Sequence, residues 1–198
     1  MARVFIIHGW GASPEKEWYR WLAMKLEQRG FTATVPRMPN PERPSINEWT
    51  AKLAEVTGSE AKPYFVGHSI GCQTILRYIE RSGKPASGVL LVAPWLHLKE
   101  AAYETEQDRE TAREWLSTPI DFKAVRTRMG SCRVIMARDD PFVPVEDSEI
   151  FRKELGASIN IMPVKSHFTA EDGYSELHAA LNEFMKMAAP AQKQGDAN

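Results

Sequence analysis

The sequence predicts a single-domain α/β protein in which a parallel sheet of about six strands is covered by helices on both faces. Short apolar runs alternate along the chain with longer segments whose apolar residues recur at helical spacing, and this alternation is typical of a parallel sheet. The chain has 198 residues, of which 43% are hydrophobic. A domain of this length can bury a sizeable core without a disulfide or a metal.

Six short runs rich in β-branched and other apolar residues are the expected strands. They span residues 3–8, 31–35, 64–67, 88–93, 133–137 and 159–164. The expected helices carry apolar residues three and four positions apart, and several stop at a glycine that can end a helix. They span residues 17–29, 46–58, 68–83, 145–155 and 174–187. Ser45, with Glu48 three residues later, is a capping-box start for the second helix.

Two segments fit the alternation poorly. Residues 98–130 are charged at their start and long for one crossover, so we expect one or two helices there, forming part of a small lid. Residues 188–198 are short and polar, and we expect them to be a disordered tail. The predicted α/β domain therefore covers residues 1–187.

Charge and cysteine content narrow the classes of function. Lys and Arg number 25 against 26 Asp and Glu, and this balance provides no attraction to nucleic acid or to an anionic membrane. No apolar stretch reaches the roughly 18 residues that span a bilayer. Cys72 and Cys132 form no CxxC pattern, and the His and Cys residues are too scattered for a metal site. We therefore expect reduced thiols in a cytoplasmic protein that binds no metal.

Residues 67–71 carry the strongest chemical signal. Their sequence, GHSIG, matches G-x-S-x-G and lies between an expected strand and an expected helix, as a nucleophile elbow requires. The two glycines remove the Cβ atoms that would clash in such a sharp turn. The turn places the Ser69 hydroxyl above the sheet and aims the Ile70 amide at a developing oxyanion. Ser69 is the predicted nucleophile, and a helix-capping serine in an ordinary turn is the alternative.

A serine nucleophile needs a base and a third group that orients the base. His167 follows the sixth expected strand, at the edge where ligands bind, whereas His178 lies inside a helical pattern, so His167 is the predicted base. Asp139 and Asp140 follow the fifth strand, and only one can face His167 because successive side chains leaving a strand point opposite ways. Asp140 is the predicted acid. The alternative is that both aspartates are solvated turn residues.

The loop after the first strand has the sequence HGWG and is expected to supply the second oxyanion donor. The Trp10 amide is the preferred donor, with the Gly9 amide as the alternative. This G-x-G lacks the third glycine of a dinucleotide fingerprint, and the chain has no P-loop, so no cofactor is expected. Trp10 and Trp95 are the predicted substrate-binding residues. Trp115 is a further candidate, and packing in the core is the alternative for all three.

Four motifs together resemble the small serine hydrolases of the α/β-hydrolase fold that are grouped with retinoblastoma-binding protein nine and its bacterial relatives. The motifs are, in chain order, HGWGASPEKEWYRWL, VGHSIG, DDPFVP and SHF. The resemblance implies a reduced hydrolase sheet of six parallel strands, catalysis without metal or cofactor, and esterase activity on small acyl esters. By that similarity Ser69, Asp140 and His167 match the nucleophile, acid and base. Trp10 departs from the more glycine-rich loop of the vertebrate member, which would narrow the acyl site.

These observations predict a serine hydrolase, specifically a carboxylesterase that cleaves small-molecule esters through an acyl-enzyme. A catalytically idle hydrolase fold used for binding is one alternative, and a peptidase or thioesterase with the same triad is another, because the fold does not determine the function. The short chain leaves little room for a cap and predicts a shallow, open site. The near-zero net charge suits an uncharged ester.

Overall fold

A computed structural model of the chain describes residues 1–189 and contains one sheet of six strands. The strands are β1 (Arg3–Ile7), β2 (Thr32–Thr34), β3 (Tyr64–His68), β4 (Ala86–Val92), β5 (Met129–Ala137) and β6 (Ser158–Met162). Their order is β2-β1-β3-β4-β5-β6, and every neighbouring pair is parallel. The predicted parallel sheet is therefore confirmed, and all its carboxyl ends lie along one edge.

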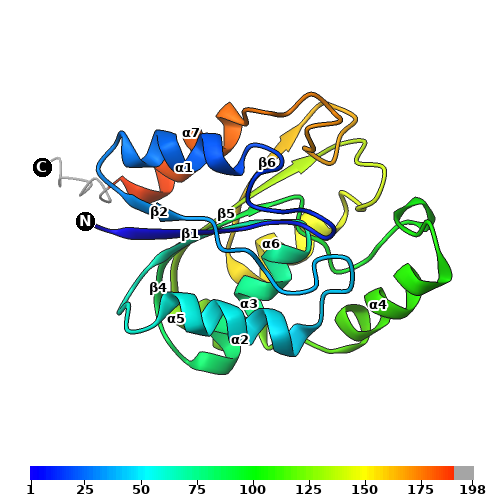
Figure 1. Cartoon of the computed structure of the whole chain (residues 1–198), viewed down its shortest axis with the longest axis horizontal. Helices are drawn as coiled ribbons and strands as arrows, with labels where there is room; N and C mark the ends of the chain where they lie inside the picture. The colour runs from blue at the N-terminus through cyan, green and yellow to red at the C-terminus, as the bar shows by residue number, and fades with distance from the viewer. Residues whose placement is uncertain (190–198) are drawn as a thin grey trace, which may run out of the picture.

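Helices cover both faces of the sheet (Figure 1). The helices α1 (Tyr19–Glu27) and α7 (His178–Ala188) lie on one face, and α2 (Ile46–Thr57), α3 (Ile70–Ser82), α5 (Phe122–Arg128) and α6 (Asp147–Leu155) lie on the other. Successive strand side chains face opposite sides, so β1 contributes to two cores. Val4 and Ile6 pack in the core under α1 and α7, while Phe5 and Ile7 pack in the core under α2 and α3.

Several element boundaries differ from the sequence prediction. β5 begins at Met129 rather than 133, because Met129 and Ser131 already pair with β4. The last helix begins at His178 rather than 174, because the Tyr174 amide bonds the Thr169 carbonyl and closes a turn there. This helix continues to Ala188, the first residue of the predicted tail. The rest of that tail, residues 190–198, lies outside the described residues.

Residues 98–130 divide into two parts. A short 3₁₀ helix, η1 (Glu100–Ala102), and α4 (Glu106–Ser117) lie beyond the carboxyl ends of the strands, where Figure 1 shows α4 standing apart from the other helices. Thr105 and Asp108 form a capping box at the start of α4. α5 instead packs against α3 and α6. We call residues 98–117 the cap segment, because they are the part of 98–130 that lies where a small lid would form.

A buried arginine fixes the end of this cap. Arg77 on α3 is only 1% exposed, and its guanidinium donates to the carbonyls of Trp115 at 2.9 Å, Thr118 at 2.7 Å and Pro119 at 3.3 Å. Gln73 Oε1 accepts a further bond at 2.9 Å. Burial lowers the pKa of Arg77 to about 10, so the side chain stays charged at neutral pH. The helix that begins beside Ser69 thus also anchors α4.

Candidate active site

The turn between β3 and α3 has the geometry of a nucleophile elbow. Ser69 has a φ of 53°, a conformation that L-residues rarely adopt. A Cβ at Gly67 would lie 2.8 Å from the Cys72 backbone, and a Cβ at Gly71 would lie 2.7 Å from the His8 carbonyl oxygen. Both glycines are therefore required by close backbone approach. The Ser69 amide donates to the Val92 carbonyl at 2.9 Å, which ties the turn to the end of β4.

His167 and Asp140 form a buried pair at the ends of β6 and β5. The two are joined by a hydrogen bond of 2.8 Å between His167 Nδ1 and Asp140 Oδ2. A carboxylate only accepts, so Nδ1 carries the proton and, in the neutral ring, Nε2 has a free lone pair. Asp140 Oδ1 accepts the amides of Phe142 at 2.9 Å and Val143 at 3.1 Å. The acid is thereby held on both oxygens, and the imidazole has the tautomer that a general base needs.

A second aspartate organises the loop that carries His167. Asp172 Oδ2 accepts from the Ser166 hydroxyl and from the His167 amide, each at 2.8 Å. The Ser166 hydroxyl in turn accepts the Phe168 amide at 2.7 Å. These bonds keep the pKa of Asp172 below its usual value despite partial burial. Asp172 was not singled out from the sequence, where its only signal is its place in the polar loop KSHFTAEDG.

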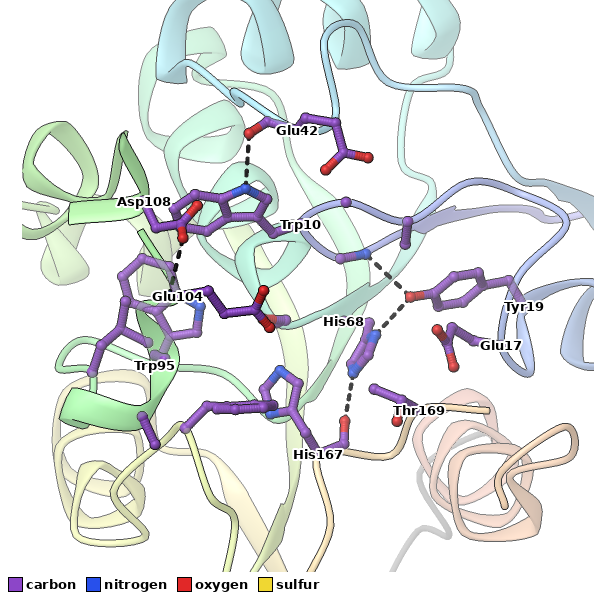
Figure 2. Close-up of a pocket in the computed structure, with 18 residues that line it drawn as sticks. Trp10, Glu17, Tyr19, Glu42, His68, Trp95, Glu104, Asp108, His167 and Thr169 are labelled. Atoms are coloured by element: carbon purple, nitrogen blue, oxygen red, sulfur yellow. Dashed lines mark hydrogen bonds between the residues drawn. The ribbon is translucent and has the colours of Figure 1, made fainter. Parts of the chain in front are cut away.

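A cavity of about 310 Å³ opens at this edge of the sheet, and Ser69 and His167 both line it. Figure 2 shows His167 on one side of the cavity, with Trp10 and Trp95 across from it. His167 bonds Asp140 through Nδ1. Within residues 1–189, no hydrogen bond joins the His167 ring to the Ser69 hydroxyl. Such bonds are often long in unliganded enzymes and shorten when substrate binds. Leu98, Ala101 and Ala102 also line the cavity, so the cap segment contributes one wall.

The loop after β1 distinguishes between the two predicted oxyanion donors. The Gly9 amide donates to the Tyr19 hydroxyl at 3.1 Å and is therefore occupied. Trp10, the next residue, lines the cavity. Ile70 is the first residue of α3, where a helical N–H has no partner within the helix. The geometry thus favours the Trp10 amide over the Gly9 amide as the partner of the Ile70 amide.

The three candidate tryptophans have different surroundings. Trp10 and Trp95 line the cavity, and the Trp10 indole donates to the Glu42 carbonyl at 3.1 Å (Figure 2). Trp115 is buried in the core, where its indole donates to the Pro44 carbonyl at 2.9 Å, and it does not line the cavity. Trp115 is therefore not a cavity residue, because its ring packs against Trp49 in the core and its indole N–H is satisfied there.

Other side chains that the sequence raised lie elsewhere. Asp139 is exposed, and His178 packs against the Trp21 ring at the start of α7. Cys72 and Cys132 are free thiols in the core, and burial raises the pKa of Cys132 to about 12 and that of Cys72 well above its usual value. Neither thiol is poised as a nucleophile.

Residues 1–189 contain neither a metal-binding cluster nor a membrane-spanning helix. No cluster of three or more His, Cys, Asp or Glu side chains in this range is arranged to hold a metal ion. No helix in the same range is both long and apolar enough to cross a membrane.

Comparison with known proteins identifies the family. The sequence profile of the family described as serine hydrolase matches residues 4–186. The chain belongs to this serine hydrolase family. The match includes the elbow, both aspartates of the DDPFVP motif and the SHF loop, so the resemblance seen in the motifs is confirmed. As a member of this family the protein is a hydrolase of the α/β-hydrolase fold.

Individual relatives agree with this placement. YdeN of Bacillus subtilis is 28% identical over 179 residues, which cover 88% of this chain and 90% of YdeN. The serine hydrolase RBBP9 of Rattus norvegicus is 24% identical over 187 residues, which cover 93% of each chain. The crystal structure of the ydeN product covers 96% of this chain and all of its own, with a TM-score of 0.83 and 25% identity.

A more distant structure shares the fold alone. Est1E from Butyrivibrio proteoclasticus has a TM-score of 0.72 and 16% identity, and the match covers 96% of this chain and 89% of Est1E. One structure of that protein contains bound ferulic acid. The three-layer arrangement of this chain is thus shared with a protein whose sequence has diverged widely.

Proposed function

We propose that the protein is a carboxylesterase that cleaves small acyl esters with Ser69 as nucleophile, His167 as general base and Asp140 as the orienting acid. The observation that supports this most strongly is the buried His167–Asp140 pair, 2.8 Å between Nδ1 and Oδ2, at the same cavity as the strained Ser69. Three residues from three different strand ends meet there in the chain order Ser, Asp, His that elbow hydrolases use.

The proposed reaction proceeds in two stages. His167 Nε2 takes the Ser69 proton as Oγ attacks the ester carbonyl, and Asp140 stabilises the imidazolium that forms. The Trp10 and Ile70 amides donate to the oxyanion of the tetrahedral intermediate. His167 then gives its proton to the departing alcohol, which leaves an acyl group on Ser69. Water, activated by His167, attacks the acyl-enzyme and releases the acid.

The cavity supports a small, uncharged ester. Its volume of about 310 Å³ lies at the lower end of the range for ligand pockets. Trp10, Trp95 and Phe142 provide apolar walls for an acyl or alcohol group. The lining side chains that carry a formal charge are all acidic, which disfavours an anionic substrate. They are Glu17, Glu42, Glu104 and Asp108.

The test is hydrolysis of a series of p-nitrophenyl esters of increasing acyl length by the wild type, Ser69→Ala and Ser87→Ala. Ser87 lies at the opposite end of β4 and bonds the Lys62 carbonyl, so its variant controls for the loss of a hydroxyl. We expect activity on the shortest esters and a loss of several orders of magnitude in Ser69→Ala alone. Full activity in Ser69→Ala would contradict the proposal. Faster turnover of matched thioesters or peptides would replace the carboxylesterase assignment with the thioesterase or peptidase alternative.

A further inference from the structure

We propose that Tyr19 and His68 are positioning residues that hold the oxyanion loop and the general base in a fixed relation to each other. Tyr19 lies at the start of α1, and His68 is the residue before Ser69. Hydrogen bonds join the Gly9 amide to the Tyr19 hydroxyl at 3.1 Å, that hydroxyl to His68 Nδ1 at 2.6 Å, and His68 Nε2 to the His167 carbonyl at 2.8 Å. Figure 2 shows this chain of three bonds along one side of the cavity. The inference rests on the proposed function and deepens it.

The partners dictate the direction of every bond in this chain. The His167 carbonyl can only accept, so His68 Nε2 carries the hydrogen. In a neutral ring Nδ1 then accepts, and the Tyr19 hydroxyl must donate to it. The Gly9 N–H can only donate, and it uses a lone pair of the same hydroxyl oxygen. One arrangement of protons therefore satisfies all three hydrogen bonds, with one donor and one acceptor in each.

Burial keeps both side chains in the required protonation states. Tyr19 is fully buried and His68 is 3% exposed. Burial, reinforced by the neighbouring His167, lowers the pKa of His68 to about 3, and burial raises the pKa of Tyr19 well above its usual value. Both groups are neutral across the physiological range. The chain is thus a fixed set of contacts rather than a group that titrates during catalysis.

The surrounding packing makes these contacts hard to replace. A Cβ at Gly9 would lie 3.3 Å from His68 Nδ1 and 3.5 Å from Ser69 Cβ, so the loop after β1 rests directly on the elbow. Trp18 donates from its indole to the Phe168 carbonyl at 3.0 Å. Trp18 therefore bonds the loop after β6, and its neighbour Tyr19 bonds the loop after β1.

The positions of two proposed catalytic groups depend on these three hydrogen bonds. The Trp10 amide follows Gly9 directly, so the bond from Gly9 to Tyr19 sets where that oxyanion donor lies. The His167 ring is attached to the residue whose carbonyl His68 holds. Displacements below an ångström at either group lower the rate while leaving ground-state binding nearly intact, because oriented donors act mainly on the transition state.

The first experiment compares Tyr19→Phe with Tyr78→Phe. Tyr78 is a matched control, because its buried hydroxyl bonds the Thr57 hydroxyl at 2.8 Å between α2 and α3, remote from the cavity. We expect Tyr19→Phe to lower kcat for p-nitrophenyl acetate about tenfold, equivalent to about 1.4 kcal/mol, with KM changed less than twofold. Tyr78→Phe should lower the melting temperature comparably and leave kcat within twofold. Equal kcat in the two variants would overturn the proposal.

The second experiment varies His68 and applies even where Tyr19→Phe fails to fold. His68→Gln keeps one donor and one acceptor, whereas His68→Phe keeps a planar ring without either. We expect a fluorophosphonate probe to label His68→Gln at least about fivefold faster than His68→Phe; equal rates would overturn the proposal. Wild-type protein that shows no labelling would instead contradict the proposed function itself, so the two failures are distinguishable.

Discussion

Asp140 holds His167 through one carboxylate oxygen and its own loop through the other. Oδ2 accepts from His167 Nδ1 at 2.8 Å, while Oδ1 accepts the amides of Phe142 and Val143. The orienting bond and the loop-forming bonds are therefore separable by chemistry. An asparagine amide could keep its oxygen for the loop amides. Its nitrogen would then face His167, and an amide nitrogen donates rather than accepts.

Asp140→Asn should consequently lower kcat while the protein stays folded. The amide nitrogen would face His167 Nδ1 and favour the wrong tautomer, an effect worth about 10⁴-fold in a comparable triad. Kinetics with p-nitrophenyl acetate and a circular dichroism melt measure the two effects. Asp139→Asn is the matched control, since Asp139 is exposed and should tolerate the change. Similar losses in both variants would contradict the choice of Asp140.

Arg77→Met should destabilise the fold by about 2–3 kcal/mol, because hydrogen bonds from a charged group are worth more than neutral ones and their carbonyl partners would be left unpaired. The carbonyls of Trp115 and Thr118 would lose their donor at the end of α4. Urea unfolding measures the change. Arg81→Met on the same helix is the control, because Arg81 is exposed and its guanidinium bonds the side chains of Asn47 and Thr50. Equal unfolding midpoints would show that the buried guanidinium does not anchor the cap.

The stability of the protein should fall as the pH decreases from about 6.5 toward 3. The pKa of His68 is about 3 in the fold and about 6.5 in an unfolded chain. Between these values the unfolded state binds a proton that the folded state does not, so the free energy of unfolding rises with pH by up to about 1.4 kcal/mol per pH unit. The pKa of buried His8 is also lowered and acts in the same direction.

Urea unfolding at pH 7, 6 and 5 measures this slope, in a window above the range where carboxylates titrate. His68→Gln has no ring to protonate and should show a shallower slope. Parallel slopes for the wild type and the variant would contradict the assignment of this pH dependence to His68.

An ester that carries a carboxylate should be a poorer substrate than a neutral ester of the same shape. The charged residues that line the cavity are acidic, and one charge pair at about 4 Å in water is worth about 1 kcal/mol, or about fivefold in kcat/KM. Glu104, drawn into the cavity from the cap in Figure 2, is the residue to change. Glu104→Gln should reduce the ratio of kcat/KM for the neutral ester to kcat/KM for the anionic ester. Glu110→Gln, which lies outside the cavity lining, should leave this ratio unchanged. A preference for the anionic ester would contradict the proposed substrate class.

Much of the fold was predictable because its signals are local. Most strands lie in short runs of apolar or β-branched residues, and the elbow needs its two glycines within five residues, where backbone contacts with Cys72 and His8 require them. The alternation of strands and helices then implies parallel strands with their carboxyl ends together. That placement alone brings the loops bearing Ser69, Asp140 and His167 to one edge.

The support around those loops was not predictable, because it depends on contacts between distant residues. Tyr19 lies within a helical pattern that also fits an ordinary core position, and its bond to His68 spans 49 residues. Asp172 has no periodic signal at all. Trp115 shows the converse error, since a tryptophan in a cap suggests a pocket wall until its indole is found bonded to Pro44.

Peptide mapping by mass spectrometry after reaction with a fluorophosphonate probe tests the central claim most directly, because phosphonylation requires a serine that a neighbouring base has activated. At neutral pH we expect one adduct per chain, located on Ser69, and its loss in Ser69→Ala and in His167→Ala. An adduct on another serine, or an unmodified Ser69 in the folded wild-type protein, would contradict the proposed nucleophile.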